Sequence, residues 1–378
     1  MKITFILPTV NMSGGIRVVA IYAEALSKRG HDVVLVSPPP KRISFKTNLK
    51  SFLKGNGWEK TVIKNSHADN LSIEHRILEK YRPVEDKDVD DADIIIATWW
   101  ETAEWVMNLS SRKGAKVYFI QHHEVHSGLP LERCKATYAF PMHKIVIAEW
   151  LRKVMLTEYG ENDVDLVSNG VDHEQFFANE RHKQEKPTVG FLYHKAEFKG
   201  VDITIKAITT LFKKHSNLRI VSFGSMSPSE TETFCGRLKF YLDPPQDLIR
   251  ELYSQCDVWI TSSRLEGFNL PAMEAMACRT PVISTKAGWP EEVIKNGYNG
   301  ALVDVDDVNA IVNETESIIN LSDASWKCMS ENAYNTVSDS SWGKSAMLFE
   351  KSLEKALLND ENKLDTRKIS KAINTCKK

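Results

Sequence analysis

The chain opens with Ile3-Thr-Phe-Ile-Leu7, a short apolar run rich in β-branched and aromatic residues that is typical of a buried strand. The turn Asn11-Met-Ser-Gly-Gly15 separates it from a helical pattern of apolar residues at Ile16, Val19, Ala20, Ala23 and Leu26. Gly30 ends that helix before a second apolar run, Asp32-Val-Val-Leu-Val36. The N-terminal segment therefore predicts a β-α-β unit, the building block of a parallel sheet with helices on both faces.

This alternation continues and then begins again after the polar stretch 179–186. Before that stretch we expect strands at Ile94–Ala97, Val117–Ile120 and Lys144–Ala148, with a helix around Thr102–Leu109. After it we expect strands at Thr188–Leu192, Leu218–Phe223, Val258–Ser262 and Pro281–Ser284, a helix at Val201–Lys214 and another from Pro271. Two doubly wound α/β domains explain this pattern better than one large sheet.

We place the domain limits from the same pattern. The first Rossmann-like domain is expected at residues 1–180 and the second at 181–340. A helix at 341–358 is expected to pack back on the first domain, and a polar, basic tail is expected at 359–378.

Composition excludes several classes of protein. The 378 residues carry 49 Lys and Arg against 50 Asp and Glu, so a global basic field for nucleic acid is excluded. The six cysteines are too far apart for a local zinc or redox motif, and reduced thiols suit the cytoplasm. Pro8 interrupts the N-terminal apolar run, which argues against a signal peptide, and no run is long enough to span a membrane.

The stretch Ser262-Ser-Arg-Leu-Glu-Gly-Phe-Asn-Leu-Pro-Ala-Met-Glu-Ala-Met-Ala-Cys278 runs from the end of a predicted strand into a helix. In open α/β sheets, ligands bind at that edge. Pro271 suits the first helical turn, so the amides of Gly267, Phe268, Asn269 and Leu270 can form an anion site at the helix N-terminus. Glu266 and Glu274 add two carboxylates, which accept hydrogen bonds from sugar hydroxyls.

With seven residues between its two glutamates, this stretch resembles the signature of the retaining GT4 glycosyltransferases. The resemblance extends to Leu252–Asp257, Thr280–Val282 and Asn296–Gly300, whereas Arg279 stands where the family usually has glycine. It implies a GT-B fold, in which two Rossmann-like domains face a central cleft. The alternative is that the glutamates only favour a helix N-terminus.

The resemblance also implies roles for residues of the second domain. Glu266 would contact the donor sugar, Glu274 the ribose diol, and the backbone of 267–270 the diphosphate. Lys199, which precedes Gly200, matches the family's diphosphate lysine. The family's arginine is missing from Val189–Lys195, so His194 or Lys195 would supply that charge, although Lys195 could equally be a solvated loop residue.

In the first domain, Gly14 and Gly15 resemble the family's Gly-Gly turn near the donor phosphates, although two such glycines can simply form a tight turn. The family's active-site histidine directly follows the corresponding strand. His122 matches that position here, with His123 as the alternate. A surface histidine without a catalytic role is the alternative. Ser168–Asp172 resembles the family's Asn-Gly-Val-Asp segment or is an ordinary turn.

The resemblance leaves the donor partly open. The backbone near Tyr241 and Leu242 falls in the family's base-binding position, and UDP-glucose is favoured by family frequency. We expect no cofactor and no metal, because Lys199 and a helix N-terminus serve the diphosphate. The Asp-x-Asp pairs lie in acidic, loop-like contexts away from the signature, at Asp88/Asp90, Asp163/Asp165 and Asp304/Asp306.

Between Lys41 and Trp58 the sequence is basic and has no acidic residue. As a helix, this segment would place Lys46, Lys50 and Lys54 on one face for contact with an anionic membrane or a lipid-linked acceptor. The alternative is a helix packed on its own domain with a lysine rim. The tail from Thr366 could add to such a basic patch.

These features predict a retaining transferase that moves a hexose from a nucleotide diphosphate sugar to a glycan or lipid-linked hydroxyl, in cell-envelope or extracellular polysaccharide synthesis. Because no carboxylate suits a covalent nucleophile, we favour the front-face reaction that the resemblance to the GT4 family implies. We expect the protein in the cytoplasm or at the inner face of the membrane. The alternatives are a nucleotide-sugar epimerase, a sugar-binding protein without an evident export signal, and a nicotinamide oxidoreductase, whose Gly-x-Gly-x-x-Gly turn is lacking.

Overall fold

The computed structural model describes residues 1–41, 65–69, 71–234 and 236–375. The chain forms two compact units. The first comprises residues 1–147 and 151–168 and the chain from Trp342 on, and the second comprises residues 148–150 and 169–341. Each unit is built on its own parallel sheet, which confirms the prediction of two Rossmann-like domains.

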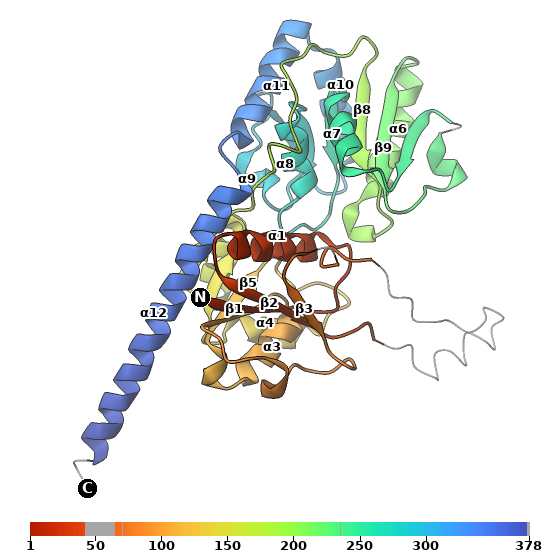
Figure 1. The fold of residues 1–378 in the computed structure, drawn as a ribbon. Helices are drawn as coiled ribbons and strands as arrows, with labels where there is room; N and C mark the ends of the chain where they lie inside the picture. The colour runs from red at the N-terminus through yellow and green to blue at the C-terminus, as the bar shows by residue number, and fades with distance from the viewer. Residues whose placement is uncertain (42–64, 70, 235, 376–378) are drawn as a thin grey trace, which may run out of the picture. The chain divides into compact units, whose positions relative to one another are not determined.

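The first unit is built on a seven-stranded sheet in the order β3-β2-β1-β4-β5-β6-β7 (Figure 1). All pairs of neighbouring strands are parallel. The strands are β1 Lys2–Ile6, β2 Asp32–Ser37, β3 Glu74–Ile77, β4 Ile94–Ala97, β5 Ala115–Ile120, β6 His143–Val146 and β7 Val164–Leu166. The helices are α1 Gly14–Lys28, α3 Trp100–Asn108, α4 Leu131–Tyr138, α5 Glu149–Tyr159 and α12 Trp342–Thr375, with short 3-10 turns η1 Asp86–Asp88 and η2 Ser111–Lys113.

The second unit repeats the plan with a six-stranded parallel sheet in the order β10-β9-β8-β11-β12-β13. The strands are β8 Thr188–Leu192, β9 Arg219–Gly224, β10 Leu238–Leu242, β11 Val258–Thr261, β12 Val282–Thr285 and β13 Gly300–Val303. The helices are α6 Val201–Lys214, α7 Gln246–Ser254, α8 Leu270–Ala277, α9 Pro290–Val293, α10 Val308–Ile319 and α11 Asp323–Val337, with 3-10 turns η3 Glu197–Lys199 and η4 Glu230–Thr233. In both sheets the order reverses beside the first strand, and ligands bind at such switch points.

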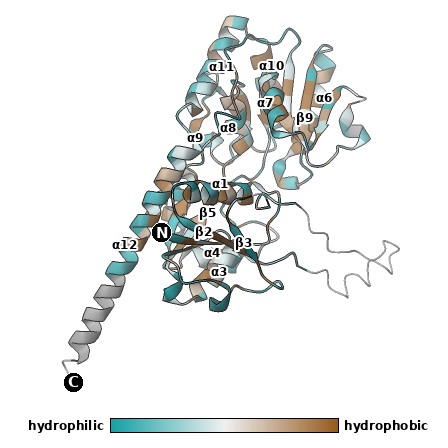
Figure 2. Cartoon of the chain, viewed as in Figure 1, coloured by the Kyte–Doolittle hydropathy of each residue, from teal (hydrophilic) through white to brown (hydrophobic). Residues whose placement is uncertain are grey.

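The central strands are buried apolar runs, as the sequence indicates. Every residue of β4 and of β11 is buried, which is typical of parallel strands covered by helices on both faces. In the second unit, α6 and α10 bring apolar side chains such as Ile208 and Ile311 onto this core. Figure 2 shows hydrophobic residues along the strands around β9.

The second unit begins at Asn169, earlier than the limit expected at residue 180. Side chains after Ser168 explain this difference. Phe176 is buried with its ring centroid 6.1 Å from that of Tyr253, and Arg181 donates to the carbonyl of Cys256 at 2.6 Å. The polar stretch at 179–186 is therefore held on the second unit, and polarity alone misplaced the boundary.

Helix α12 lies along α1 and β5 of the first unit. Phe349 is buried, with its ring stacked on Tyr22 at 4.5 Å, and Ser352 donates to Asp165 at 2.7 Å. The helix runs to Thr375, so the expectation that it ends at 358 was wrong. No glycine or proline follows Gly343, so nothing in the sequence breaks the helix after Leu358.

The basic residues Lys46, Lys50 and Lys54 lie outside the described residues, as does the end of the tail at 376–378. In the parts of the chain that the structure describes, no helix has the length and apolar character needed to cross a membrane.

Candidate functional site

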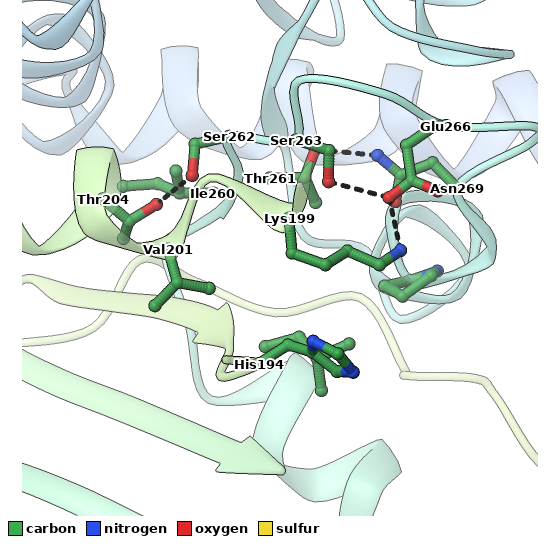
Figure 3. Close-up of a pocket in the computed structure, with 12 residues that line it drawn as sticks. His194, Lys199, Val201, Thr204, Ile260, Thr261, Ser262, Ser263, Glu266 and Asn269 are labelled. Carbon is green, nitrogen blue, oxygen red and sulfur yellow. Dashed lines mark hydrogen bonds and ion pairs between the residues drawn. The ribbon is translucent and has the colours of Figure 1, made fainter. Parts of the chain in front are cut away.

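A pocket lies at the carboxyl ends of β8 and β11 in the second unit (Figure 3). His194 follows β8, Lys199 ends the turn η3, and Ser263 and Glu266 follow β11. The pocket therefore occupies the switch point at which an open α/β sheet binds its ligand. Its charged side chains, Lys199 and Glu266, come from segments that the sequence singled out.

Glu266 is the centre of the hydrogen bonds in this pocket. Its Oε1 accepts from the Lys199 ammonium at 2.7 Å and from the Ser263 hydroxyl at 2.7 Å (Figure 3). The Glu266 side chain is 11% exposed and that of Lys199 25% exposed. Two donors thus fix the orientation of a carboxylate that has little contact with solvent.

Gly200 explains how Lys199 comes so close to the end of β11. The residue has a φ of 60°, and a Cβ atom added there would lie 1.9 Å from the carbonyl oxygen of Ser262. Ser262 in turn donates its hydroxyl to the Gly200 carbonyl at 2.7 Å. Only glycine permits this close approach, which places Lys199 opposite Glu266.

The loop from Gly267 to Leu270 leads into α8 with its backbone held in place. Asn269 has a φ of 82°, and its side-chain amide donates to Thr261 Oγ1 at 3.0 Å (Figure 3). Phe268 stacks on Trp289 at 5.1 Å, and the carbonyl of Gly267 accepts from the Trp150 indole at 2.9 Å. Among the described residues, no hydrogen bond is recorded from the amides of Phe268, Asn269 and Leu270, so these donors suit an anion.

Glu274 lies on α8 and is 6% exposed. Its Oε2 accepts from the hydroxyl of Tyr253 on α7 at 2.9 Å. The Tyr253 ring packs against Trp259 at 4.5 Å, so an aromatic group holds the hydroxyl in place. Tyr253 was not singled out from the sequence, because a tyrosine on a neighbouring helix has no spacing that marks its partner.

His194 and Lys195 differ in their surroundings. His194 lines the pocket and its Nδ1 accepts from the amide of Ala196 at 2.9 Å, so the neutral ring carries its proton on Nε2. Burial, together with the positive charge of Lys199, lowers the pKa of His194 below its ordinary value. Lys195 is exposed. Against the effect of burial, hydrogen bonds from Ser229 and Tyr193 and the positive charge of Lys195 lower the pKa of Glu232.

Tyr241 and Leu242 end β10, the edge strand beyond β9. The Tyr241 ring lies under the Lys239 ammonium at 5.1 Å, and Leu242 is exposed. Both residues therefore lie at the same sheet edge as the Lys199 pocket, two strands away from β8.

The first unit brings the Gly-Gly turn and the end of β5 together. Gly14 and Gly15 begin α1, and a Cβ atom on Gly15 would lie 3.7 Å from Oε1 of Gln121, the residue before His122. His122 Nδ1 donates to the carbonyl of His123 at 2.9 Å, which leaves Nε2 unprotonated in the neutral ring.

His123 is held by aromatic neighbours. Its Nε2 lies 2.8 Å from the hydroxyl of Tyr159, and its ring packs against Tyr138 at 5.6 Å. Burial lowers the pKa of His123 below its ordinary value. These contacts hold the His123 ring in a fixed position.

Tyr138 and Glu124 form a buried polar cluster behind these histidines. The Tyr138 hydroxyl accepts from the amide of Glu124 at 2.8 Å and donates to the carbonyl of His122 at 3.3 Å. The Glu124 carboxylate accepts from the amide of Trp100, the first residue of α3, at 2.8 Å. Burial raises the pKa of Glu124 well above its ordinary value. The sequence singled out neither residue, because both act from beneath the site.

The Asp-x-Asp pairs are bound to basic side chains. Asp88 pairs with Arg82 and Asp90 with Arg76. In each of the other two Asp-x-Asp sequences, one aspartate forms an ion pair: Asp165 with Lys355, and Asp306 with Arg264. Over the described residues, no group of three or more His, Cys, Asp or Glu side chains is arranged to hold a metal ion.

Comparison with known protein families identifies the family of this chain. Residues 172–336 match the family described as Glycosyl transferases group 1, and residues 12–175 match Glycosyltransferase Family 4. The chain belongs to the GT4-like glycosyltransferase family and has the GT-B fold. The group 1 match contains Lys199, Glu266 and Glu274, so it covers the whole pocket described above.

Curated relatives match this GT4-like chain over part of their length. A D-inositol 3-phosphate glycosyltransferase of Corynebacterium kroppenstedtii is 29% identical over 48% of this chain and 46% of its own. The capsular polysaccharide biosynthesis glycosyltransferase CapM of Staphylococcus aureus is 24% identical over 47% of this chain and 50% of its own. The chain thus spans about half the length of the curated relatives it matches.

A solved structure shares the fold over nearly the whole GT4-like chain. Anabaena Alr3699/HepE, solved in complex with UDP-glucose, superposes with a TM-score of 0.70 and 16% identity, over 94% of this chain and all of that one. At this level of identity the likeness concerns the fold alone.

Arg279, where the sequence departs from the GT4 pattern, has a left-handed backbone with a φ of 59°. Its guanidinium donates to the carbonyl of Ala178 at 2.9 Å, pairs with Glu331, and lies over the Tyr334 ring at 4.2 Å. These contacts stabilise a conformation in which glycine is the usual residue.

Proposed function

We propose that this protein is a retaining glycosyltransferase that moves a hexose from a nucleotide diphosphate sugar to a hydroxyl of a glycan or lipid-linked acceptor. The observation that carries the proposal is the Lys199–Glu266–Ser263 constellation beside the amides that open α8. It combines a cation and backbone donors for phosphate with a carboxylate for sugar hydroxyls, at the edge of the sheet where such folds bind ligands.

For the donor we propose UDP-glucose. Glu266 would accept from the sugar hydroxyls, and the buried carboxylate of Glu274 from the ribose diol. Tyr241 and Leu242 would present backbone to the base. The fold neighbour from Anabaena was solved with UDP-glucose, which supports this choice of donor.

The proposed chemistry follows from the charges in the pocket. As the bond from the anomeric carbon to the diphosphate breaks, negative charge grows on the leaving oxygen, and Lys199 and the amides of 268–270 would stabilise it. A departing phosphate oxygen takes the proton of the acceptor hydroxyl as that hydroxyl attacks the same face of the sugar. We propose that no metal is required, because Lys199 and these amides already provide donors for the diphosphate.

From the first unit we propose that Gly14 and Gly15 contribute backbone for the donor phosphates and the acceptor, and that His122 contacts the donor sugar. The relative from Staphylococcus aureus is named for capsular polysaccharide biosynthesis, which supports a cell-envelope or extracellular glycan as product. We propose that the reaction takes place in the cytoplasm or at the inner face of the membrane. Cys134, Cys256, Cys278 and Cys328 are free thiols, which suits that compartment.

The test is a panel of nucleotide sugars, each supplied with glycan and polyprenyl-phosphate-linked acceptors in the presence of EDTA. The expected result is transfer from UDP-glucose to give an α-linked product, with turnover unaffected by the chelator. A β-linked product would contradict retention. Interconversion of the nucleotide sugar without any acceptor would support the epimerase reading instead.

A further inference from the structure

The cation expected to hold the diphosphate is bound to the carboxylate expected to hold the sugar. Lys199 Nζ and Glu266 Oε1 are 2.7 Å apart, and Figure 3 shows the two side chains meeting across the pocket. Both are largely shielded from solvent, so the pair is stronger than a surface ion pair. A ligand that draws Lys199 away must therefore give Glu266 another partner or leave its charge poorly compensated.

A nucleotide sugar and a free nucleotide diphosphate differ in whether they offer Glu266 a new hydrogen-bond donor. The diphosphate of either attracts Lys199, but only the nucleotide sugar brings hydroxyl groups that can donate to Glu266. Free UDP also ends in a phosphate that carries additional negative charge near neutral pH, because its second ionisation has a pKa of about 6. Glu266 therefore opposes the free nucleotide more than it opposes the nucleotide sugar.

We propose that the Lys199–Glu266 ion pair makes the site discriminate against free UDP in favour of the intact nucleotide sugar, and so promotes release of the product nucleotide. This inference rests on the proposed function, because it takes a nucleotide sugar as the ligand of this pocket. Glu266 then has two roles, as the acceptor for sugar hydroxyls and as the competitor of the diphosphate for Lys199.

The neighbours of the ion pair leave the competition for Lys199 to Glu266 and the diphosphate. Ser263 donates to the same Oε1 at 2.7 Å, so the carboxylate stays in place when Lys199 moves toward a phosphate. The other titratable side chain lining the pocket is His194, whose lowered pKa keeps it neutral near pH 7.5. Among the residues that line the pocket, Lys199 and Glu266 thus carry the charge.

The test measures the dissociation constants of UDP and UDP-glucose by isothermal titration for the full-length protein and its Glu266→Gln variant at pH 7.5. Glutamine keeps the shape of the side chain and removes its charge. The expected result is that the variant binds UDP three- to ten-fold more tightly than the unaltered protein does. Its binding of UDP-glucose should be unchanged or weaker, so that the preference for the nucleotide sugar is lost.

Two further variants make the result specific to the pair. In a Lys199→Gln background the same Glu266→Gln change should tighten UDP by less than half as much, as a double-mutant cycle for interacting residues requires. Glu197 is exposed and lies on the same turn as Lys199, so Glu197→Gln removes a nearby charge without touching the pair. It should leave the ratio of the two constants within a factor of two.

An unchanged ratio in Glu266→Gln, an equal gain without Lys199, or the same effect in Glu197→Gln would each overturn the inference. If the unaltered protein binds neither UDP nor UDP-glucose, the proposed donor fails instead. The two failures are therefore distinguishable, because the first requires a protein that binds both ligands.

Discussion

At the scale of single residues, the pocket contains a neutral histidine where the GT4 pattern has an arginine. His194 accepts from the Ala196 amide through Nδ1, and adding a proton to Nδ1 would break that hydrogen bond. Burial and Lys199 lower the pKa of His194, so the neutral form prevails at and somewhat below the ordinary histidine pKa of about 6.5. His194 can offer a phosphate an N–H donor, but Lys199 carries the charge.

This assignment predicts a flat pH response. Because the pKa of His194 is lowered below the ordinary value of about 6.5, the neutral ring predominates throughout pH 6.5 to 8 and gains less than half a charge over that range. The affinity for UDP-glucose, measured by titration calorimetry, should change by less than twofold over that range. His194→Gln should weaken binding less than Lys199→Gln does, since a neutral donor contributes about 1 kcal/mol and a charged one about 1.5–3 kcal/mol.

A several-fold gain in affinity on lowering the pH from 8 to 6.5, abolished by His194→Gln, would show that the ring binds as a cation. The account of a neutral His194 would then be wrong.

At the scale of elements, α4 holds the loop that follows β5. Tyr138 ends α4, and its hydroxyl bridges the amide of Glu124 and the carbonyl of His122. Tyr159 on α5 instead contacts the ring of His123. Two tyrosines of one aromatic cluster thus hold the two candidate histidines in different ways.

The variants Tyr138→Phe and Tyr159→Phe therefore form a matched pair. Each removes one hydroxyl and keeps the ring. Tyr138→Phe should lower kcat several-fold with little change in the KM for the donor, because it frees the backbone that orients His122. Tyr159→Phe should leave kcat within a factor of two. The opposite order in steady-state kinetics would make His123 the active-site residue.

The same elements show what sequence could predict. Buried strands such as β4 and β8 were found because their apolar runs need no knowledge of the tertiary structure. The edge strand β3, Glu-His-Arg-Ile, was missed because it is polar and none of its residues is buried. Within the candidate site, Glu266 and Lys199 were named from a motif. Ser263, Tyr253 and Tyr138 were missed, since their roles depend on packing that brings distant residues together.

At the scale of the whole molecule, the last helix is part of the first unit. Phe349 on α12 packs between Tyr22 of α1 and Phe119 of β5, at 4.5 and 5.0 Å. The second unit has a core of its own around Ile208 and Ile260. Loss of the Phe349 ring should therefore affect the stability of one unit.

Phe349→Ala should cost the first unit about 3–5 kcal/mol, the usual loss for a large aromatic side chain removed from a core. Urea unfolding followed by circular dichroism measures this loss. The affinity for UDP should be retained in the variant below its unfolding transition, because the donor pocket belongs to the second unit. A variant that is folded but has lost UDP binding would contradict this division of roles.

The central claim is that the second unit binds a nucleotide sugar through its paired glutamates, and the affinity of Glu274→Ala for UDP-glucose tests it most directly. Loss of hydrogen bonds to a charged carboxylate costs about 1.5–3 kcal/mol, which corresponds to a dissociation constant roughly 10- to 150-fold larger. We expect that loss in titration calorimetry, with the far-ultraviolet circular dichroism of the variant unchanged. A folded variant that binds UDP-glucose as tightly as the unaltered protein would contradict the account.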